Sequence, residues 1–392
     1  MIIKGVKAFK VLNSRADPTI GIQVRTSRGR AWASAPSGAS VGKHEVKAYP
    51  GSVKSSISLV NSKFTKLLKD IKINEVKDLK KIEEKLTVSK IGGDPIIALE
   101  FAILKELARE RREHVCDIIN PKAKKMPKLL SNVVGGGSHA YGGLDIQEIL
   151  IYPETKSFSE GAFLNAKIDQ KLKLKLEKID KHFLGGKTDE GAWTTSLADT
   201  QALSAVKGVI ESEKAKVHMG IDLAASELYK NRKYVWRNYT YKDRKRALSK
   251  EEQIATVKDL IKKYDLRYVE DPLEQEDFKG FAEFDQSKVN ICGDDLTTTN
   301  ISRMRKAIRN KSINSIIIKP NQIGSVLKTL KAVDLAKRAG LKVIVSHRSG
   351  STGDDSLAHL AKAVEADFVK IGISGGERII KINELIKLEQ LK

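Results

Sequence analysis

Several strand-like segments in the second half of the chain end at an ionisable residue. Lys319 follows Ser315-Ile-Ile-Ile and precedes Pro320, whose missing N–H group ends strand pairing. The same position after a strand-like segment is held by Asp222, Glu270, Asp294 and Lys370, and Lys342-Val-Ile-Val-Ser346 is followed by His347-Arg348-Ser349. Because the carboxyl ends of parallel strands meet at one edge of a sheet, we expect these acids and cations to lie together there.

The three acids of this set would each reach the site from a separate strand, which suits a hard divalent cation. Ligation by oxygen alone, with no cysteine or histidine partner, points to Mg²⁺. Asp271 and Asp295 follow two of these acids directly; on an extended backbone they would point away, so we expect structural roles for them. Near a metal and other cations the ammonium form of Lys319 is disfavoured, so its pKa is expected to fall toward that of a general base.

Segments with helical spacing separate these strands, at residues 301–308, 326–339 and 356–364. Alternating strands and helices build a parallel sheet, and enough such units close into a barrel whose active site lies at the carboxyl ends of the strands. A chain of 392 residues has room for such a barrel, of about 250 residues, and for a smaller domain.

The first part of the chain predicts a compact α+β domain. A three-stranded meander and three helical segments are expected at residues 4–11, 19–26, 31–35, 53–71, 76–86 and 95–112. The domain is expected to end near Asn120-Pro121. We therefore divide the chain into an N-terminal lid domain, residues 1–120, and a barrel domain, residues 121–392.

Glycine-bearing loops that could approach a ligand occur at residues 36–42, 135–143 and 185–192. The second loop carries His139, and a lone histidine in a glycine-rich loop is expected to face solvent. The third loop carries the paired acids Asp189-Glu190. Between these two loops, residues 144–151 alternate as a strand does, with Gln147-Glu148 interrupting the apolar character.

The composition is that of a globular protein with an unusual net charge of +22 and only 6% aromatic residues. The lysine clusters carry no interleaved aromatics and no nucleic-acid motif, so a solvated lysine-rich surface is favoured over a dedicated nucleic-acid site. A positive field would also attract a small anionic substrate. The sequence shows neither a membrane span nor an export signal, and its two cysteines lack metal or redox spacing, which predicts a cytoplasmic location.

Taken together, the motifs resemble those of the enolase family, in order and over almost the whole chain. They are Ser37-Gly-Ala-Ser40, Gly136-Gly-Ser-His139-Ala, Gln147-Glu148, Asp189-Glu190-Gly191, Gly220-Ile-Asp222, Val269-Glu270-Asp271-Pro272, Asp294-Asp295-Leu-Thr, Lys319-Pro-Asn-Gln-Ile-Gly324, Ser346-His-Arg348-Ser349-Gly and Val369-Lys370-Ile-Gly372. The resemblance implies an α+β lid over a modified (βα)8 barrel. It also implies Mg²⁺-dependent, reversible dehydration of 2-phosphoglycerate to phosphoenolpyruvate by a hydro-lyase of glycolysis and gluconeogenesis, in a dimer or larger homo-oligomer.

The resemblance also implies a role for each matching residue. Lys319 corresponds to the base that removes the C2 proton, and Glu190, supported by Glu148, to the group that protonates the departing C3 hydroxyl. The implied ligands of the first Mg²⁺ are Asp222, Glu270 and Asp294, and Ser40 would bring a second Mg²⁺ that arrives with the substrate. The implied substrate contacts are Arg348 and Ser349 for the phosphate, Lys370 for the carboxylate, and His139 and Gln147 near the loop.

Three departures from the usual family pattern keep two alternatives open. They lie at Asn13-Ser-Arg-Ala16-Asp17-Pro-Thr19, at Thr188-Asp-Glu-Gly-Ala192 with Trp193-Thr-Thr-Ser196 after it, and in a shortened segment between Glu154 and Glu190. One alternative is a related enzyme that acts on another 2-hydroxy or phosphorylated acid. The other is a non-catalytic, basic binding protein on the same fold. The retained phosphate and metal residues favour the working enzyme.

Overall fold

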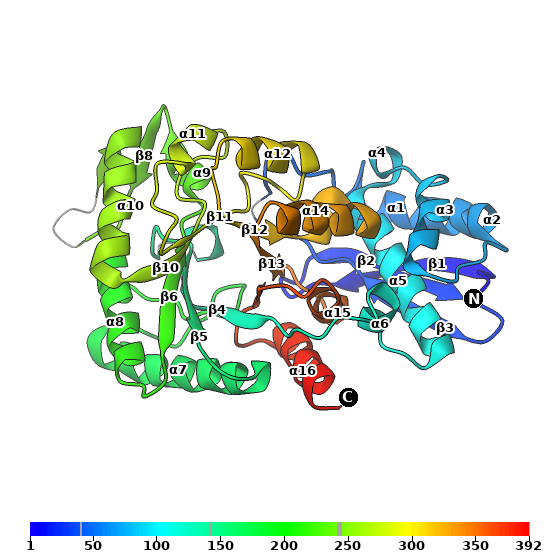
Figure 1. Cartoon of the computed structure of the whole chain (residues 1–392), viewed down its shortest axis with the longest axis horizontal. Helices are drawn as coiled ribbons and strands as arrows, with labels where there is room; N and C mark the ends of the chain where they lie inside the picture. The colour runs from blue at the N-terminus through cyan, green and yellow to red at the C-terminus, as the bar shows by residue number, and fades with distance from the viewer. Residues whose placement is uncertain (40, 141–142, 241–244, 392) are drawn as a thin grey trace.

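The computed structural model describes residues 1–39, 41–140, 143–240 and 245–391. Figure 1 shows the N-terminal elements, in blue and cyan, at one end of the long axis and the barrel at the other, with both chain termini on the side of the N-terminal elements. The fold is therefore the predicted one: a closed eight-stranded barrel with helices around it and a small antiparallel sheet built from the start of the chain. The boundary near residue 120 stays a prediction.

The N-terminal sheet is an antiparallel meander of β1 (Gly5–Leu12), β2 (Pro18–Arg25) and β3 (Arg30–Ser34). Its inner face is apolar, with Ile20, Ile22 and Val24 fully buried, and the long helix α5 (Gly93–Arg111) packs against β2 and β3. The remaining elements of this part are α1 (Val53–Leu59), a π-helical turn (Val60–Phe64), α2 (Thr65–Leu68), a 3₁₀ turn (Val76–Leu79), α3 (Lys80–Glu83), α4 (Val88–Ile91) and α6 (Val115–Ile119). The single helices expected at 53–71 and 76–86 are thus interrupted by tighter and wider turns.

The barrel closes in the strand order β10-β11-β12-β13-β14-β4-β5-β6. Its strands are β4 (Lys128–Gly135), β5 (Glu148–Pro153), β6 (Val217–Asp222), β10 (Leu266–Glu270), β11 (Asn290–Gly293), β12 (Ser315–Ile318), β13 (Lys342–Ser346) and β14 (Phe368–Lys370). The expected all-parallel pairing holds except at β5, which pairs antiparallel with both β4 and β6. Among its described residues, the link between β4 and β5 contains only the short turn Gly137–His139, and without a helical crossover the chain has to reverse.

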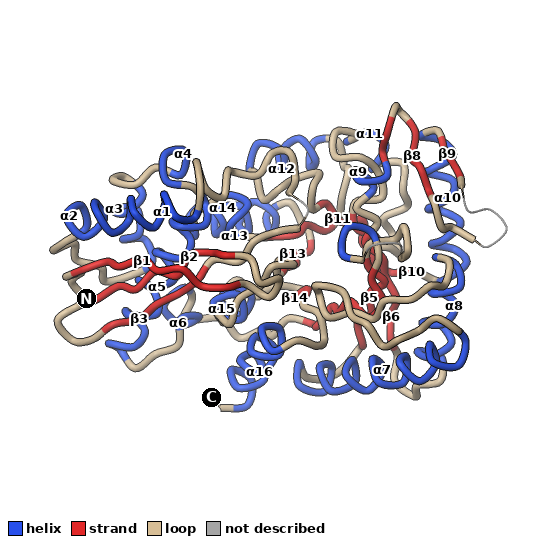
Figure 2. Tube along the Cα trace, turned by 180° about the vertical axis from the view of Figure 1, so that it is seen from behind, coloured by secondary structure: helices blue, strands red, loops and turns tan. Residues whose placement is uncertain are grey.

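Helices surround the barrel on the outside, as Figure 2 shows from behind. The helices of this part of the chain are α7 (Phe158–Ile179), α8 (Asp199–Glu211), α9 (Ala225–Leu228), α10 (Lys250–Tyr264), α11 (Phe278–Phe281), α12 (Ile301–Arg309), α13 (Pro320–Ile323), α14 (Val326–Arg338), α15 (Ser356–Ala363) and α16 (Gly376–Gln390). The short α13 lies at the barrel mouth, where its Gln322 contacts Asp294. A small second sheet, which the sequence did not predict, is formed by β7 (Tyr229–Lys230), β8 (Lys233–Trp236) and β9 (Arg246–Leu248).

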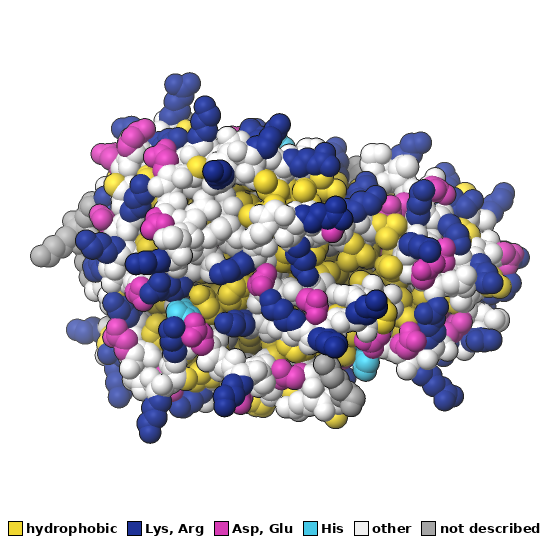
Figure 3. All heavy atoms as spheres, viewed as in Figure 1, with side chains coloured by type: hydrophobic (Ala, Val, Ile, Leu, Met, Phe, Trp, Pro, Cys, Tyr) yellow, Lys and Arg dark blue, Asp and Glu magenta, His cyan; other side chains and the backbone are white. Residues whose placement is uncertain are grey.

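The surface agrees with a solvated distribution of the surplus positive charge. On the face that Figure 3 shows, lysine and arginine side chains are spread over all elements and mixed with acids, without one concentrated patch. Within the described part of the chain, no helix is both long enough and apolar enough to span a membrane.

Candidate active site

The interior of the barrel contains a layer of apolar side chains. The positions of the site residues can be counted along the strands from this layer. This layer comprises Leu130, Leu150, Tyr152, Tyr268, Cys292, Ile317, Ile344 and Phe368. Side chains on one face of a strand recur every second residue. Two positions further along six parallel strands therefore stand Asn132, Glu270, Asp294, Lys319, Ser346 and Lys370. On antiparallel β5 the direction is reversed, so Glu148 precedes Leu150 and pairs in register with Asp222 of β6.

The buried ammonium of Lys370 contacts three carboxylates, one each from β5, β6 and β10. Its Nζ lies 2.9 Å from Asp222 Oδ2, 2.8 Å from Glu270 Oε2 and 3.1 Å from Glu148 Oε2. Burial opposes its charge, but Asp222 and the other carboxylates raise the pKa of Lys370 well above its ordinary value. The amine therefore stays charged at neutral pH and concentrates positive charge at the mouth of the barrel.

Lys319 forms an ion pair with Asp294, the acid at the end of the neighbouring strand. The other oxygen of Asp294 accepts a hydrogen bond from Gln322 Nε2 at 2.9 Å. Burial lowers the pKa of Lys319, and Arg348 and Lys370 add to that effect, yet Asp294 more than offsets them and the pKa is raised. The expected fall in pKa is thus wrong for this arrangement, because the sequence argument counted the nearby cations but not the carboxylate in contact.

The acids at the mouth fit a hard divalent cation in their chemistry. Glu270 is fully buried, and its Oε1 has no hydrogen-bond partner among the described residues. Burial, followed by repulsion from Asp222, raises the pKa of Glu270 to about 8. A carboxylate oxygen that lacks a hydrogen-bond partner suits Mg²⁺ as a ligand. The ligand atoms of Asp222, Glu270 and Asp294 do not, however, all lie within 4.8 Å of one another. Instead, Lys319 pairs with Asp294 and Lys370 pairs with Glu270.

Asp271 and Asp295 stay close to Asp294 rather than pointing away from it. Oxygen atoms of all three carboxylates lie within 4.8 Å of one another. The backbone is not extended at Asp271, where φ is 41°, so the alternation on which the prediction relied does not hold. The predicted structural role remains consistent with the contacts, because Asp271 accepts hydrogen bonds from the backbone N–H groups of Asp294 at 3.1 Å and Asp295 at 2.7 Å.

Glu190 lies between two buried histidines. His139 Nε2 is 3.6 Å from Glu190 Oε1, and His347 Nε2 is 3.4 Å from Glu190 Oε2. The other ring nitrogen of His139, Nδ1, lies 2.8 Å from Asp189 Oδ1. The prediction that a lone histidine in this loop faces solvent was therefore wrong: the acids of the third loop enclose it.

Glu148 and Glu190 form a carboxyl pair whose two pKa values are shifted in opposite directions. Burial, followed by repulsion from Glu190, raises the pKa of Glu148 well above its ordinary value. Burial would also raise the pKa of Glu190, but His139 and His347 lower it well below the ordinary value. The two pKa values are therefore shifted in opposite directions, so that a proton shared by the pair favours Glu148 over Glu190. Two carboxyl groups separated in this way can divide acid and base tasks.

The loop that carries Glu190 is held by backbone contacts that only particular residues allow. Gly191 has φ of 80°, and a Cβ there would lie 2.3 Å from the carbonyl oxygen of Ser374. Arg378, fully buried, donates from Nη2 to the carbonyl oxygens of Asp189 at 2.6 Å and Ser349 at 3.0 Å. The guanidinium thus ties the acid loop to the loop after β13.

Thr188, one of the departures from the usual family pattern, organises this loop. Its Oγ1 accepts hydrogen bonds from the backbone N–H groups of Glu190 at 3.2 Å and Ala192 at 3.3 Å. The side chain also packs against Gly135, where a Cβ would lie 2.7 Å from Thr188 Cγ2. The substitution is therefore compatible with a defined position for Glu190.

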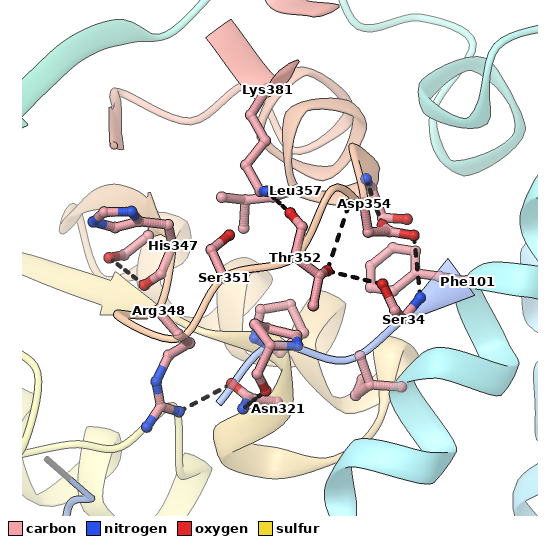
Figure 4. Close-up of a pocket in the computed structure, with 15 residues that line it drawn as sticks. Ser34, Phe101, Asn321, His347, Arg348, Ser351, Thr352, Asp354, Leu357 and Lys381 are labelled. Atoms are coloured by element: carbon pink, nitrogen blue, oxygen red, sulfur yellow. Dashed lines mark hydrogen bonds between the residues drawn. The ribbon is translucent and has the colours of Figure 1, made fainter. Parts of the chain in front are cut away.

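The residues expected to bind phosphate lie at the junction with the N-terminal part. Arg348 Nη1 lies 2.9 Å from Glu45 Oε2 and donates to Asn321 Oδ1 at 3.0 Å, the latter visible in Figure 4. Ser349 Oγ accepts from the backbone N–H of Ala39 at 2.6 Å. Both side chains are buried, and both are engaged by the loop that follows β3.

Two further predicted residues differ in what can be said of them. Gln147 is buried beside the site, and its Oε1 accepts from Ser138 Oγ at 2.7 Å. Ser40, predicted as a ligand of a second Mg²⁺, lies outside the described residues. The cavity between the site residues measures about 20 Å³, roughly the space of one water molecule.

Sequence reasoning did not single out several side chains that complete the site. His347 could have been found, since it stands directly between two residues of the phosphate motif. Asn132 could have been found by counting along β4; it is buried, and neither of its side-chain amide atoms has a hydrogen-bond partner in the described structure. Arg378 and Glu45 gave no local signal, because their partners lie far away in the chain.

Comparisons with known proteins agree with this geometry. Residues 3–119 match the family model described as "Enolase, N-terminal domain", and residues 123–391 match "Enolase, C-terminal TIM barrel domain". Among curated relatives, a protein named enolase from Archaeoglobus fulgidus is 40% identical over 100% of this chain and 98% of its own length. Enolases from Methanothermobacter thermautotrophicus and Thermoplasma acidophilum are 38% and 37% identical, each over 99% of this chain and over 96% and 98% of their own lengths.

Proposed function

The chain belongs to the enolase family and is therefore a hydro-lyase; we propose that within it Lys319 removes the C2 proton of 2-phosphoglycerate and Glu190 acts on the departing C3 hydroxyl. Loss of the two groups yields phosphoenolpyruvate, and the reverse reaction adds water. The observation that carries the proposal is the convergence of Lys319, Lys370 and the strand-end acids directly above the apolar layer of the barrel.

The C2 proton of a carboxylate is weakly acidic, so its removal needs concentrated positive charge around the product of deprotonation. Lys370 contributes a permanent ammonium, and we assign it to the substrate carboxylate. Mg²⁺ held by Asp222, Glu270 and Asp294 would add Lewis-acid stabilisation of that carboxylate and would compete with Lys319 for Asp294. Once released from Asp294, Lys319 loses the contact that raises its pKa and can give up its proton to act as the base.

The C3 hydroxyl leaves as water only if a proton reaches it. We assign the source of this proton to Glu148, whose pKa is raised, and Glu190, adjacent to it and to two histidines, is positioned to relay the proton to the substrate. His139 narrows the site on the same side, and we assign it to substrate binding together with Gln147. Arg348 and Ser349 are assigned to the phosphate.

The two alternatives are less well supported. A related enzyme that acts on a 2-hydroxy acid without a phosphate would not need the phosphate residues Arg348 and Ser349, which are retained and buried beside the catalytic groups. A non-catalytic binding protein would not need to keep both halves of the carboxyl pair and the base. The relatives named enolase match over nearly full length, which favours the glycolytic reaction.

Finer features remain part of the proposal. We propose two Mg²⁺ ions per site, the second arriving with the substrate and contacting Ser40, and a homo-oligomeric assembly. The domain division at residues 120 and 121 and a cytoplasmic location belong here too. Both cysteines are buried free thiols in the described structure, which suits a reducing compartment.

A coupled assay with 2-phosphoglycerate and Mg²⁺ tests the proposal. Wild-type protein is expected to form phosphoenolpyruvate, and Lys319→Ala is expected to lose that activity by more than about 10³-fold, at the upper part of the range for a general base. The matched control is Lys331→Ala, an exposed lysine of α14. No product from wild type, or full activity in Lys319→Ala, would contradict the assignment.

A further inference from the structure

Glu45 is a buried acid of the N-terminal part that forms a two-point ion pair with Arg348. Its Oε2 lies 2.9 Å from Arg348 Nη1, and its Oε1 accepts from Arg348 Nη2 at 3.2 Å. Both side chains are almost excluded from solvent, with 6% and 4% exposed, respectively. Paired contacts of this kind fix the orientation of the guanidinium plane as well as its position.

The same carboxylate holds the glycine-bearing loop that precedes it. Glu45 Oε1 accepts a hydrogen bond from the backbone N–H of Gly42 at 3.0 Å, and it lies 3.4 Å from Gln322 Nε2. Gln322 in turn donates to Asp294 Oδ1 at 2.9 Å. Glu45 therefore connects the loop, the guanidinium and one of the acids at the mouth of the barrel.

A second contact joins the loop to the other residue assigned to phosphate. The backbone N–H of Ala39 donates to Ser349 Oγ at 2.6 Å, and the N–H of Ser37 donates to the carbonyl oxygen of Gly350 at 2.8 Å. Both side chains assigned to phosphate are thus bonded to one loop of the N-terminal part. Whatever changes their position changes the loop as well.

Glu45 also stabilises the charge of the buried Arg348 side chain. Burial opposes the guanidinium charge, and Glu45 is the largest contribution that offsets burial and raises the pKa of Arg348. Asn321 Oδ1 accepts from Nη1 on another side, as Figure 4 shows. Without the Glu45 charge, a group that fixes the guanidinium orientation would be lost.

We propose that Glu45 is a positioning residue: it orients the Arg348 guanidinium for the substrate phosphate and couples the loop residues Ser37, Ala39 and Gly42 to occupancy of the phosphate site. This inference rests on the assignment of Arg348 to the phosphate. It adds a residue from the N-terminal part, which does not touch the reacting carbons, to the determinants of substrate binding.

The variant that tests the proposal is Glu45→Gln, which keeps the shape and one acceptor but removes the charge and the second acceptor. The KM for 2-phosphoglycerate is expected to rise about tenfold, the equivalent of roughly 1.4 kcal/mol, while kcat changes less than about threefold, because Lys319 and Glu190 are untouched. Inhibition by inorganic phosphate should weaken by the same factor.

Lys105→Met is the matched control. Lys105 is a half-buried cation of α5 that pairs across the same junction with Asp354 at 2.9 Å and Asp355 at 2.7 Å, without contacting Arg348. Lys105→Met should lower the thermal stability about as much as Glu45→Gln does. It should leave the KM within about twofold of the wild-type value, because KM depends on contacts with the substrate.

Each other outcome overturns the inference. An unchanged KM in Glu45→Gln would mean that Glu45 does not position Arg348. A lowered KM would make Glu45 an internal anion that competes with phosphate. Equal KM changes in both variants would make the role merely structural. Direct calorimetric titration with inorganic phosphate separates failure of the inference from failure of the proposed function: if wild type does not turn over but binds phosphate more tightly than Glu45→Gln does, only the reaction assignment fails.

Discussion

The ammonium of Lys370 lies 2.9 Å from Asp222 Oδ2, although 148 residues separate the two in sequence. They meet because β14 and β6 both end at the mouth of the barrel, with only β4 and β5 between them in the strand order. Their contact shows how strand ends from distant parts of the chain combine acids and cations in one buried site. Such pairs keep the ammonium charged in a place where burial alone would favour its neutral form.

Asp222→Asn is expected to weaken Mg²⁺ binding, because it removes a charged oxygen ligand and leaves the amide to face Lys370. We expect the Mg²⁺ concentration for half-maximal activity to rise at least about tenfold, in line with losses caused by removing support from a metal site. Titration of activity with Mg²⁺ after chelation measures this. Asp334→Asn, an exposed acid of α14, serves as control, and an equal response in both variants would contradict the metal assignment.

Glu190→Gln is expected to separate the two halves of the reaction. The amide cannot relay a proton, so dehydration should fall by about 10²-fold or more. Removal of the C2 proton depends on Lys319 and should continue. Proton NMR of 2-phosphoglycerate in deuterated water, together with an assay for phosphoenolpyruvate, distinguishes the two steps; loss of both to the same extent would argue against a role confined to the hydroxyl.

Asp94 is expected to make the stability of the fold depend on pH. It is fully buried at the start of α5, and burial raises its pKa to about 6. A carboxyl group whose pKa is raised on folding stabilises the fold fully below its unfolded-state pKa, and this contribution is lost as pH rises through about 6. A shift of two units corresponds to about 3 kcal/mol.

The comparison with Asp94→Asn isolates this contribution. The asparagine side chain does not titrate. Between pH 4 and pH 7 the free energy of unfolding of the variant should therefore fall by about 3 kcal/mol less than the free energy of unfolding of wild type does. Asp94 Oδ1 accepts from Asn321 Nδ2 at 3.3 Å, a contact that the asparagine oxygen can keep. Parallel stability curves from chemical denaturation over this pH range would rule out a raised pKa.

Much of the site could be predicted because strand geometry leaves little freedom. Isoleucines at 316–318 require a buried strand, and the two-residue period then fixes which following side chain points into the barrel mouth. The same logic located Asp222, Glu270, Asp294 and Lys370. Family motifs added the roles that geometry alone could not assign.

The parts that were not predicted depend on contacts between distant segments. Residues 144–147 alternate like a strand, but Asp145 accepts hydrogen bonds from the backbone N–H groups of Arg237 at 2.6 Å and Asn238 at 2.5 Å, so this segment is held in a loop. The reversal of β5 had a sequence signal, the lack of a helix after β4. The position of Glu45, 303 residues from Arg348, had none.

The sign of the pKa shift at Lys319 illustrates the same limit. Its cationic neighbours could be inferred from the sequence, whereas the contact with Asp294 depends on side-chain conformation. An ion pair at contact distance outweighs more distant like charges in a buried site. Lys319 is therefore stabilised in its charged form for as long as it is paired with Asp294.

The most direct test of the account is exchange of the C2 proton of 2-phosphoglycerate for deuterium, followed by proton NMR with Mg²⁺ present. Wild type and the control Lys331→Ala should exchange this proton, Glu190→Gln should still exchange it, and Lys319→Ala should not. Exchange by Lys319→Ala at the wild-type rate would contradict the claim that the amine at the end of β12 is the base.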